Sequence, residues 1–176
     1  MQPSALIRFL PLTLAAGACS TTSEVPDERL GSAILRQADG IPVGTAQILT
    51  RGDSVFVSVA VAGLAQGPHG FHLHATGSCK APDFKSAGGH LNPLGKEHGS
   101  LNPSGKHLGD LNNLEVGASG TASDSFDLPG TREVISAWLF DDDGTAFVIH
   151  SDADDYRSDP AGNAGARIAC GVIEPL

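Results

Sequence analysis

The chain has 176 residues, of which 40% are hydrophobic, and its 20 acidic against 11 basic side chains give a net charge of −9. That length suits one domain, and 22 Gly with 11 Pro indicate many turns, which disfavours a helical bundle. Proteins that cover nucleic-acid phosphates rely on Lys and Arg, so the acidic balance argues against a nucleic-acid partner.

The N-terminal residues 1–18 have the pattern of a secretory signal. Arg8 is their one charged residue, and an apolar run over 9–16 follows it. This run is shorter than the roughly 20 residues that a membrane-spanning helix needs, and Pro11 interrupts it. We therefore expect residues 1–18 to be a signal peptide that directs export and is then removed.

Small residues at 16–18 would admit cleavage before Cys19. A cysteine at the new N-terminus resembles the bacterial lipoprotein pattern, so we expect a periplasmic protein anchored to a membrane only through a lipid on Cys19. The alternative is plain cleavage that leaves Cys19 as a free thiol. Residues 19–29 are polar and predict a flexible tether, with the folded domain spanning 30–176.

Short β-prone runs separated by turn residues follow from residue 30. They are 30–37, 43–50, 54–61, 71–75, 114–116, 120–126, 135–140, 146–150 and 167–173. In the run 54–61 every odd position is Val, which is typical of a half-buried strand. No segment shows a convincing 3.6-residue period, so the sequence predicts an all-β sandwich or flattened barrel.

The stretch from residue 75 to residue 111 is rich in Gly, Pro, Asn, Lys and His and lacks a clear strand or helix. Ordering such a loop costs considerable entropy, so something must hold it. Cys79 and Cys170 are the only cysteines after residue 19, and in an oxidising compartment they can pair. The bridge would stabilise the fold by about 4 kcal/mol; the alternative is two unpaired buried thiols.

Histidines are the second candidate for holding the loop. Six of the seven histidines fall into a pattern of a pair two residues apart, three loop positions and one later strand end: His72, His74, His90, His98, His107 and His150. Residues two apart on a strand point the same way, so the pair can aim at one point that His150 can join. The three loop histidines together with Asp110 make a closed tetrahedral zinc set.

Four stretches of the chain resemble copper/zinc superoxide dismutases. They are GFHLH at 70–74, SAGGH at 86–90, HSDADD at 150–155 and GNAGARIACG at 162–171. The resemblance covers about 30–173. It implies a Greek-key sandwich or flattened eight-stranded barrel with a long metal-binding loop and a second active-site loop. It also implies an enzyme that dismutates superoxide to oxygen and hydrogen peroxide.

The same resemblance implies one copper and one zinc per domain. Copper would be bound by His72, His74, His90 and His150, and zinc by His90, His98, His107 and Asp110. His90 would bridge the two ions, since seven side chains cannot fill two four-coordinate sites unless one of them serves twice. Only a deprotonated imidazole offers a nitrogen to each metal, and two adjacent cations favour loss of that proton.

The resemblance assigns roles to two further charged residues. Arg167 would attract and orient superoxide beside copper. Asp154 would hydrogen-bond a copper-ligand histidine and a zinc-ligand histidine, such as His72 and His98, which fixes the orientation of both rings. The seventh histidine, His69, is interpreted as a structural residue bonded to backbone.

Two features bear on substrate attraction and on alternative functions. The segment 156–160 is short for a loop that guides a substrate, so attraction of an anion to this acidic chain must be local. The candidate cations are Lys80, Lys85, Lys96, Lys106 and Arg167. The main alternative to an enzyme is an exported protein that stores or delivers copper and zinc on the same fold, which the presence of Arg167 and His150 disfavours. A homodimer is compatible with the sequence, which locates no interface.

Overall fold

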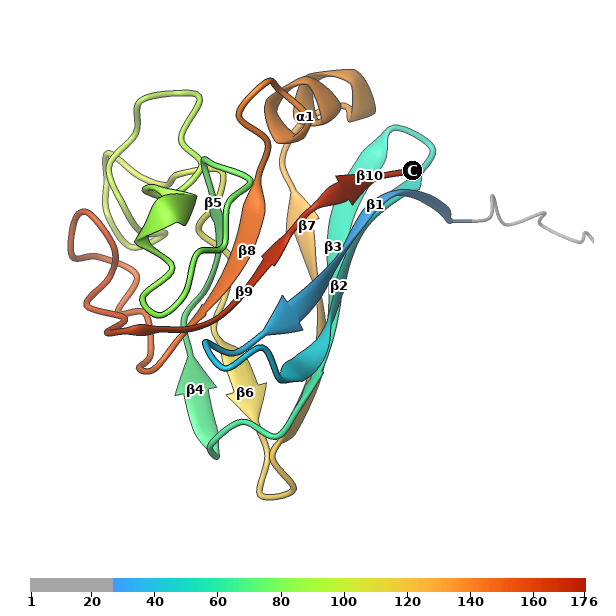
Figure 1. Cartoon of the computed structure of the whole chain (residues 1–176). Coiled ribbons are helices and arrows are strands. Elements are labelled where there is room, and N and C mark those ends of the chain that lie inside the picture. Colours follow the sequence, from blue (N-terminus) through green and yellow to red (C-terminus); the bar gives the residue numbers. More distant parts are fainter. Residues whose placement is uncertain (1–26) are drawn as a thin grey trace, which may run out of the picture.

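The computed structural model describes residues 27–176 and shows a curled antiparallel sheet with two long loops on one side of it (Figure 1). The expected signal peptide, Cys19 and most of the expected tether lie outside the described residues. Among residues 27–176, no helix combines the length and the apolar character needed to cross a membrane.

The main sheet has eight strands in the order β5-β8-β9-β1-β2-β3-β7, with β10 paired to β1, and β4 and β6 form a separate pair. The strands are β1 Glu28–Arg36, β2 Pro42–Arg51, β3 Ser54–Ala62, β4 Gly67–His69, β5 Phe71–His74, β6 Leu114–Val116, β7 Thr121–Leu128, β8 Ala146–His150, β9 Arg167–Val172 and β10 Glu174–Pro175. The helices are η1 Lys85–Ala87 and α1 Arg132–Leu139. The prediction of an all-β fold is confirmed.

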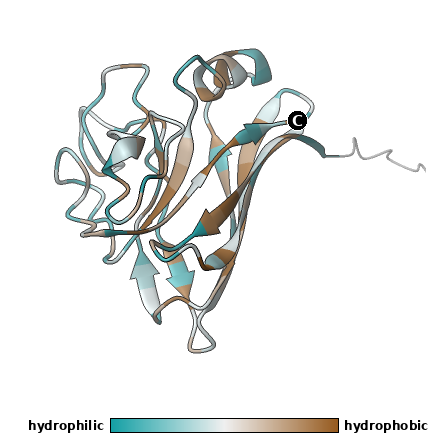
Figure 2. Ribbon diagram, in the orientation of Figure 1, coloured by the Kyte–Doolittle hydropathy of each residue, from teal (hydrophilic) through white to brown (hydrophobic). Residues whose placement is uncertain are grey.

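The core lies inside the curl of the sheet. Along β3 the valines at odd positions are buried, and the residues between them are exposed or half-buried, as the period of two predicts. The strand β8 is hydrophobic along most of its length (Figure 2) and is buried throughout. Phe71 of β5 and Phe126 of β7 belong to opposite ends of the strand order, yet their ring centroids are 5.9 Å apart. The sheet therefore curls until its two end strands meet across the core.

One predicted strand is wrong. We expected a strand over 135–140 and no helix, whereas Arg132–Leu139 is the helix α1 at one end of the sheet (Figure 1). The Thr131 side chain accepts a hydrogen bond from the Val134 N–H, which caps the helix start. Ile135 and Leu139, four residues apart, are both fully buried, so one face of the helix packs on the core. Eight residues are too few for this period to stand out from a short apolar run.

The first strand begins earlier than expected. β1 starts at Glu28 rather than at residue 30, so the last two residues of the expected tether belong to the sheet. Both carboxylate oxygens of Glu28 accept hydrogen bonds from Arg132 at the start of α1, at 2.6 and 2.8 Å. This ion pair joins the first strand to a helix that lies 104 residues later in the sequence.

The two long loops are tied to the sheet and to each other. The disulfide Cys79–Cys170 is present, with a Cα–Cα distance of 5.7 Å, and it links the loop between β5 and β6 to β9. The His98 N–H in this loop donates to the Asp159 carboxylate in the loop between β8 and β9, at 2.7 Å. The two loops therefore lie against each other beside β5 and β8, where the histidines are.

Candidate metal centre

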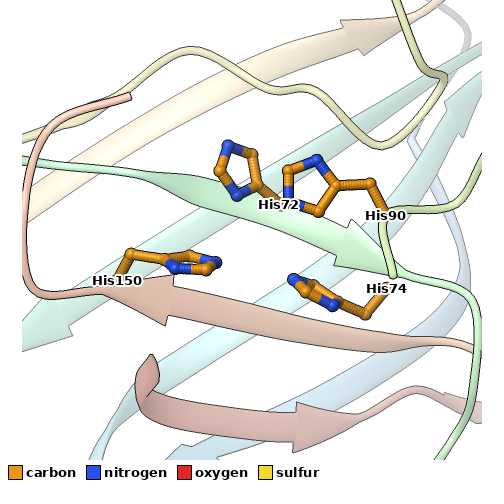
Figure 3. Close-up of side chains that lie close together, drawn as sticks. All are labelled: His72, His74, His90 and His150. Carbon is orange, nitrogen blue, oxygen red and sulfur yellow. The ribbon is translucent and has the colours of Figure 1, made fainter. Parts of the chain in front are cut away.

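Four histidines from three segments form the first cluster, which we call the four-histidine group: His72, His74, His90 and His150. Two of them alternate along β5 and point to the same side of the strand, and one ends the neighbouring strand β8. His90 comes from the long loop, whose backbone pairs with that of His74. Figure 3 shows the four rings gathered beside these two strands. All four residues are buried.

Each ring of the four-histidine group has one buried nitrogen without a hydrogen-bond partner. These atoms are His72 Nδ1, His74 Nε2, His90 Nε2 and His150 Nε2. Each residue offers a ligand atom within 4.8 Å of those of the others. A buried polar atom left unpaired costs about 1–3 kcal/mol, so four such atoms in one place fit a cation held between them. A donor set made up only of imidazole nitrogens is one that suits copper.

The remaining ring nitrogens of this group are held in fixed positions. His74 Nδ1 lies 3.0 Å from the Gly88 carbonyl oxygen, and His72 Nε2 lies 2.8 Å from Asp154 Oδ2. His90 Nδ1 lies 2.8 Å from Asp110 Oδ1. These contacts orient the rings, so that the unpaired nitrogens keep facing one another.

The second cluster, which we call the aspartate group, comprises His90, His98, His107 and Asp110. The Nδ1 atoms of its three histidines lie 2.8, 3.0 and 3.1 Å from one oxygen, Asp110 Oδ1. All four residues are buried. Three imidazole nitrogens converging on one carboxylate oxygen form the donor set of a closed zinc site.

His90 is the only residue common to the two groups. Its Nδ1 faces the aspartate group, whereas its Nε2 is the unpartnered atom of the four-histidine group. The ring of His72 in the four-histidine group and the ring of His98 in the aspartate group have centroids 5.9 Å apart, which shows how closely the groups adjoin. One imidazole therefore offers a nitrogen to each of two neighbouring sites.

Asp154 joins the two groups a second time, from outside. Its Oδ2 lies 2.8 Å from His72 Nε2, and its Oδ1 lies 2.9 Å from His98 Nε2. The Asp154 side chain is fully buried. One carboxylate thus orients a ring of each group, and these are the two contacts that the family resemblance implied.

The ionisation of three rings of the four-histidine group and of Asp110 suits cation binding. Burial is the main cause that lowers the pKa of His74 to about 2, of His150 to about 3 and of His90 to about 4, and the neighbouring imidazoles contribute to each of these shifts. The three rings are therefore neutral at pH 7, with lone pairs free. Burial raises the pKa of the Asp110 carboxyl, but hydrogen bonds from His90 and His98 outweigh it and hold that pKa well below its ordinary value.

Arg167 supplies a fixed positive charge beside the four-histidine group. Its Nη1 donates to the Phe84 carbonyl at 2.8 Å and its Nη2 to the Gly88 carbonyl at 2.7 Å. The Gly88 carbonyl is also the partner of His74 Nδ1, so the guanidinium and that ring share one acceptor. A surface pocket of about 290 Å³ is lined by Arg167, His90 and His150. A small anion entering it meets the guanidinium and both rings.

Comparison with known proteins decides the family. The copper/zinc superoxide dismutase family model matches residues 43–173. The chain belongs to this family. All of the metal-site donors described above, including the histidine shared between the two groups, lie within the matched residues.

Individual copper/zinc superoxide dismutases align with most of the length of this chain. Superoxide dismutase [Cu-Zn] 2 of Aquifex aeolicus is 44% identical over 142 residues, covering 79% of this chain and 83% of that protein. The superoxide dismutase-like protein of Bacillus subtilis is 46% identical over 106 residues, which span 59% of this chain and only about half, 54%, of that protein. The structure of the Cu/Zn superoxide dismutase from Brucella abortus has a TM-score of 0.66 at 30% identity, covering 85% of this chain and 100% of that one.

The structure brings together all of the side chains that the sequence singled out around the two groups. The remaining histidine, His69, is buried outside both groups, with Nδ1 2.8 Å from the His150 carbonyl oxygen and Nε2 2.9 Å from that of Ala65. Its contacts are to backbone, as expected. Two of the candidate steering cations have partners: Lys85 lies 3.1 Å from an Asp83 carboxylate oxygen, and Lys106 donates to the Asp110 carbonyl.

Sequence reasoning missed the residues that hold Asp154. The side-chain amide of Asn113 contacts both the N–H and the carbonyl of Asp154, and the Tyr156 N–H donates to its carboxylate. Tyr156 belongs to a segment noted only for being short, and Asn113 follows the aspartate group with no distinguishing pattern. No periodicity relates positions 41 residues apart, so only the folded arrangement reveals these contacts.

Proposed function

We propose that this protein dismutates superoxide to oxygen and hydrogen peroxide, with one copper bound by the four-histidine group and one zinc bound by the aspartate group. The observation that carries the proposal is the position of His90, which offers Nε2 to one group and Nδ1 to the other. Relatives named as copper/zinc superoxide dismutases support it. We further propose that the protein acts in the periplasm, anchored through Cys19.

The reaction consumes two superoxide anions and two protons and yields one oxygen and one hydrogen peroxide. When bound, copper would accept an electron from one superoxide and return it to the next, whereas zinc has no redox chemistry and would hold His90 and the long loop. The chain must therefore attract an anion, place it beside the four-histidine group and supply a proton there.

Arg167 is the group that attracts and orients the anion. It is the one basic residue among the described residues that line the pocket with His90 and His150. Its two hydrogen bonds to backbone carbonyls hold the guanidinium in place, so no reorganisation is needed when the anion arrives. Because the chain as a whole is negative, this local charge must overcome a repulsive background.

His90 is the group that can carry the proton. Its Nε2 has no partner in the protein, while its Nδ1 is held toward Asp110. A proton taken up at Nε2 therefore faces the four-histidine group and the pocket, where the reduced oxygen species would need it. The ring keeps its orientation during the transfer because its other nitrogen stays in the aspartate group.

Metal analysis combined with a dismutation assay tests the proposal. We expect one copper and one zinc per chain, and a dismutation rate that disappears when copper is removed and returns when copper, but not zinc, is added back. A fully loaded protein that binds both metals tightly and dismutates no superoxide would instead favour metal storage or delivery.

The dismutation rate should fall as ionic strength rises. Salt screens charges over a Debye length of about 10 Å at 0.1 M, so a rate assisted by Arg167 should drop severalfold between about 10 mM and 200 mM salt. The measurement is kcat/KM across that range. Arg167→Ala should lower the rate and abolish or reverse the dependence, because only the negative background remains, whereas Arg167→Lys should keep its sign. A flat profile for the wild type would contradict local attraction.

A further inference from the structure

Tyr156 makes polar contacts with three other residues, one in its own loop and two in the long loop between β5 and β6. Its N–H donates to Asp154 Oδ1 at 2.6 Å, its carbonyl accepts from the Leu101 N–H at 2.9 Å, and its hydroxyl accepts from the Asn113 N–H at 2.8 Å. Leu101 lies in the long loop three residues after His98, and Asn113 directly precedes β6. One residue therefore joins the loop after β8 to the long loop at two points, one within the segment that carries the aspartate group and one just after it.

Asn113 holds Asp154 from the other side. Its Oδ1 accepts from the Asp154 N–H at 2.8 Å, and its Nδ2 donates to the Asp154 carbonyl at 3.0 Å. With the Tyr156 hydroxyl on the Asn113 backbone, the three residues form a closed ring of hydrogen bonds. We call the pair Tyr156 and Asn113 the clasp.

The backbone of Tyr156 indicates that its side chain matters. Its φ is 61°, in the left-handed region that glycine and asparagine adopt most readily and that is strained for a bulky residue. Residues held in this way persist where their surroundings over-determine them. Gly99, next to His98, leaves room for this backbone, because a Cβ at position 99 would collide with the Tyr156 carbonyl.

We propose that Tyr156 is a positioning residue that, with Asn113, fixes the Asp154 carboxylate between the two metal groups. The inference rests on the proposed function, since it requires that the groups bind ions. Asp154 Oδ2 contacts His72 and its Oδ1 contacts His98. Loss of the clasp leaves the carboxylate free to turn, so both rings lose a fixed partner and the bound ions escape faster.

The test measures release of copper and zinc from the fully loaded protein into an excess of chelator. Removing a partner that orients a ligand typically costs about 10- to 100-fold in metal affinity, so Asp154→Asn should speed release by that factor. Tyr156→Phe removes only the hydroxyl and acts one step further away; it should speed release by about 3- to 10-fold. Ser158→Ala is the matched control, since it removes a hydroxyl bonded to Asp155 in the same loop and should release both ions at the wild-type rate.

A double-mutant cycle separates positioning from general stability. If Tyr156 acts through Asp154, Tyr156→Phe should change release by less than about twofold in the Asp154→Asn background. An equal acceleration in both backgrounds, or release at the wild-type rate from Tyr156→Phe, would overturn the proposal. The same cycle with Asn113→Ala gives a second determination should Tyr156→Phe fail to fold. A wild-type protein that binds no metal would instead refute the proposed function, so the two failures are distinguishable.

Discussion

Replacing His150 with alanine should abolish copper-dependent dismutation and leave the zinc site intact. His150 Nε2 is one of the four unpartnered nitrogens of the four-histidine group, and His150 takes no part in the aspartate group. Losing a residue that merely orients a ligand costs about 10- to 100-fold, so losing a ligand should cost more, on the order of 1000-fold in kcat/KM. The measurements are copper and zinc content and the dismutation rate at saturating copper.

Chemical rescue distinguishes a lost ligand from a damaged fold. His150 lines the open pocket, so the space left by His150→Ala is reachable from solvent. Added imidazole should therefore restore part of the copper binding and of the activity, whereas it should leave the wild type unchanged. Zinc content near one per chain shows that the aspartate group is still assembled. A His150→Ala protein with full copper content and wild-type dismutation would contradict the assignment of this residue.

Part of each metal group was predictable from a local rule, whereas the place of His90 in the four-histidine group was implied by the family resemblance. Residues two apart on a strand share a face, which places His72 and His74 together wherever β5 lies in the fold. The loop histidines and Asp110 lie within one connected stretch, so they can enclose a site without help from distant residues. The pattern of residue types alone then indicates imidazole and carboxylate donors.

The arrangement around Asp154 was predictable only in part. A resemblance between motifs suggested that this carboxylate meets His72 and His98, and the structure shows both contacts. What holds the carboxylate there could not be predicted, because the clasp depends on how one loop packs on another. A left-handed tyrosine has no sequence signature, since propensity favours glycine or asparagine at such a position.

The helix α1 shows a second limit. Its cap, Thr131, and its buried pair, Ile135 and Leu139, are ordinary helix signals. They occupy eight residues in a chain dominated by strands, and the neighbouring apolar residues Trp138 and Phe140 blur the period. The burial of one helix face against the core, which the sequence does not display, decides between helix and strand.

Replacing Cys79 and Cys170 together with alanine should lower the free energy of unfolding of the metal-free protein by about 4 kcal/mol. The disulfide closes a sequence separation of 91 residues, and a long closed loop greatly restricts the unfolded chain. Alanine is used in place of serine because Cys170 is buried in a small apolar cluster with Phe84, where the hydroxyl of a serine would have no hydrogen-bond partner. Denaturant unfolding of the oxidised wild type, the reduced wild type and the double variant gives the difference.

The same double variant should also lose activity, because the disulfide anchors the acceptors of Arg167. Cys79 begins the segment whose Phe84 and Gly88 carbonyls hold the guanidinium. If this segment is more mobile, the guanidinium of Arg167 no longer keeps a fixed position beside the pocket. The value of kcat/KM should therefore fall, and its dependence on ionic strength should weaken toward that of Arg167→Ala. Reductant should reproduce both effects in the wild type and change nothing in the variant. Unchanged activity with lowered stability would show that the disulfide stabilises the fold without positioning Arg167.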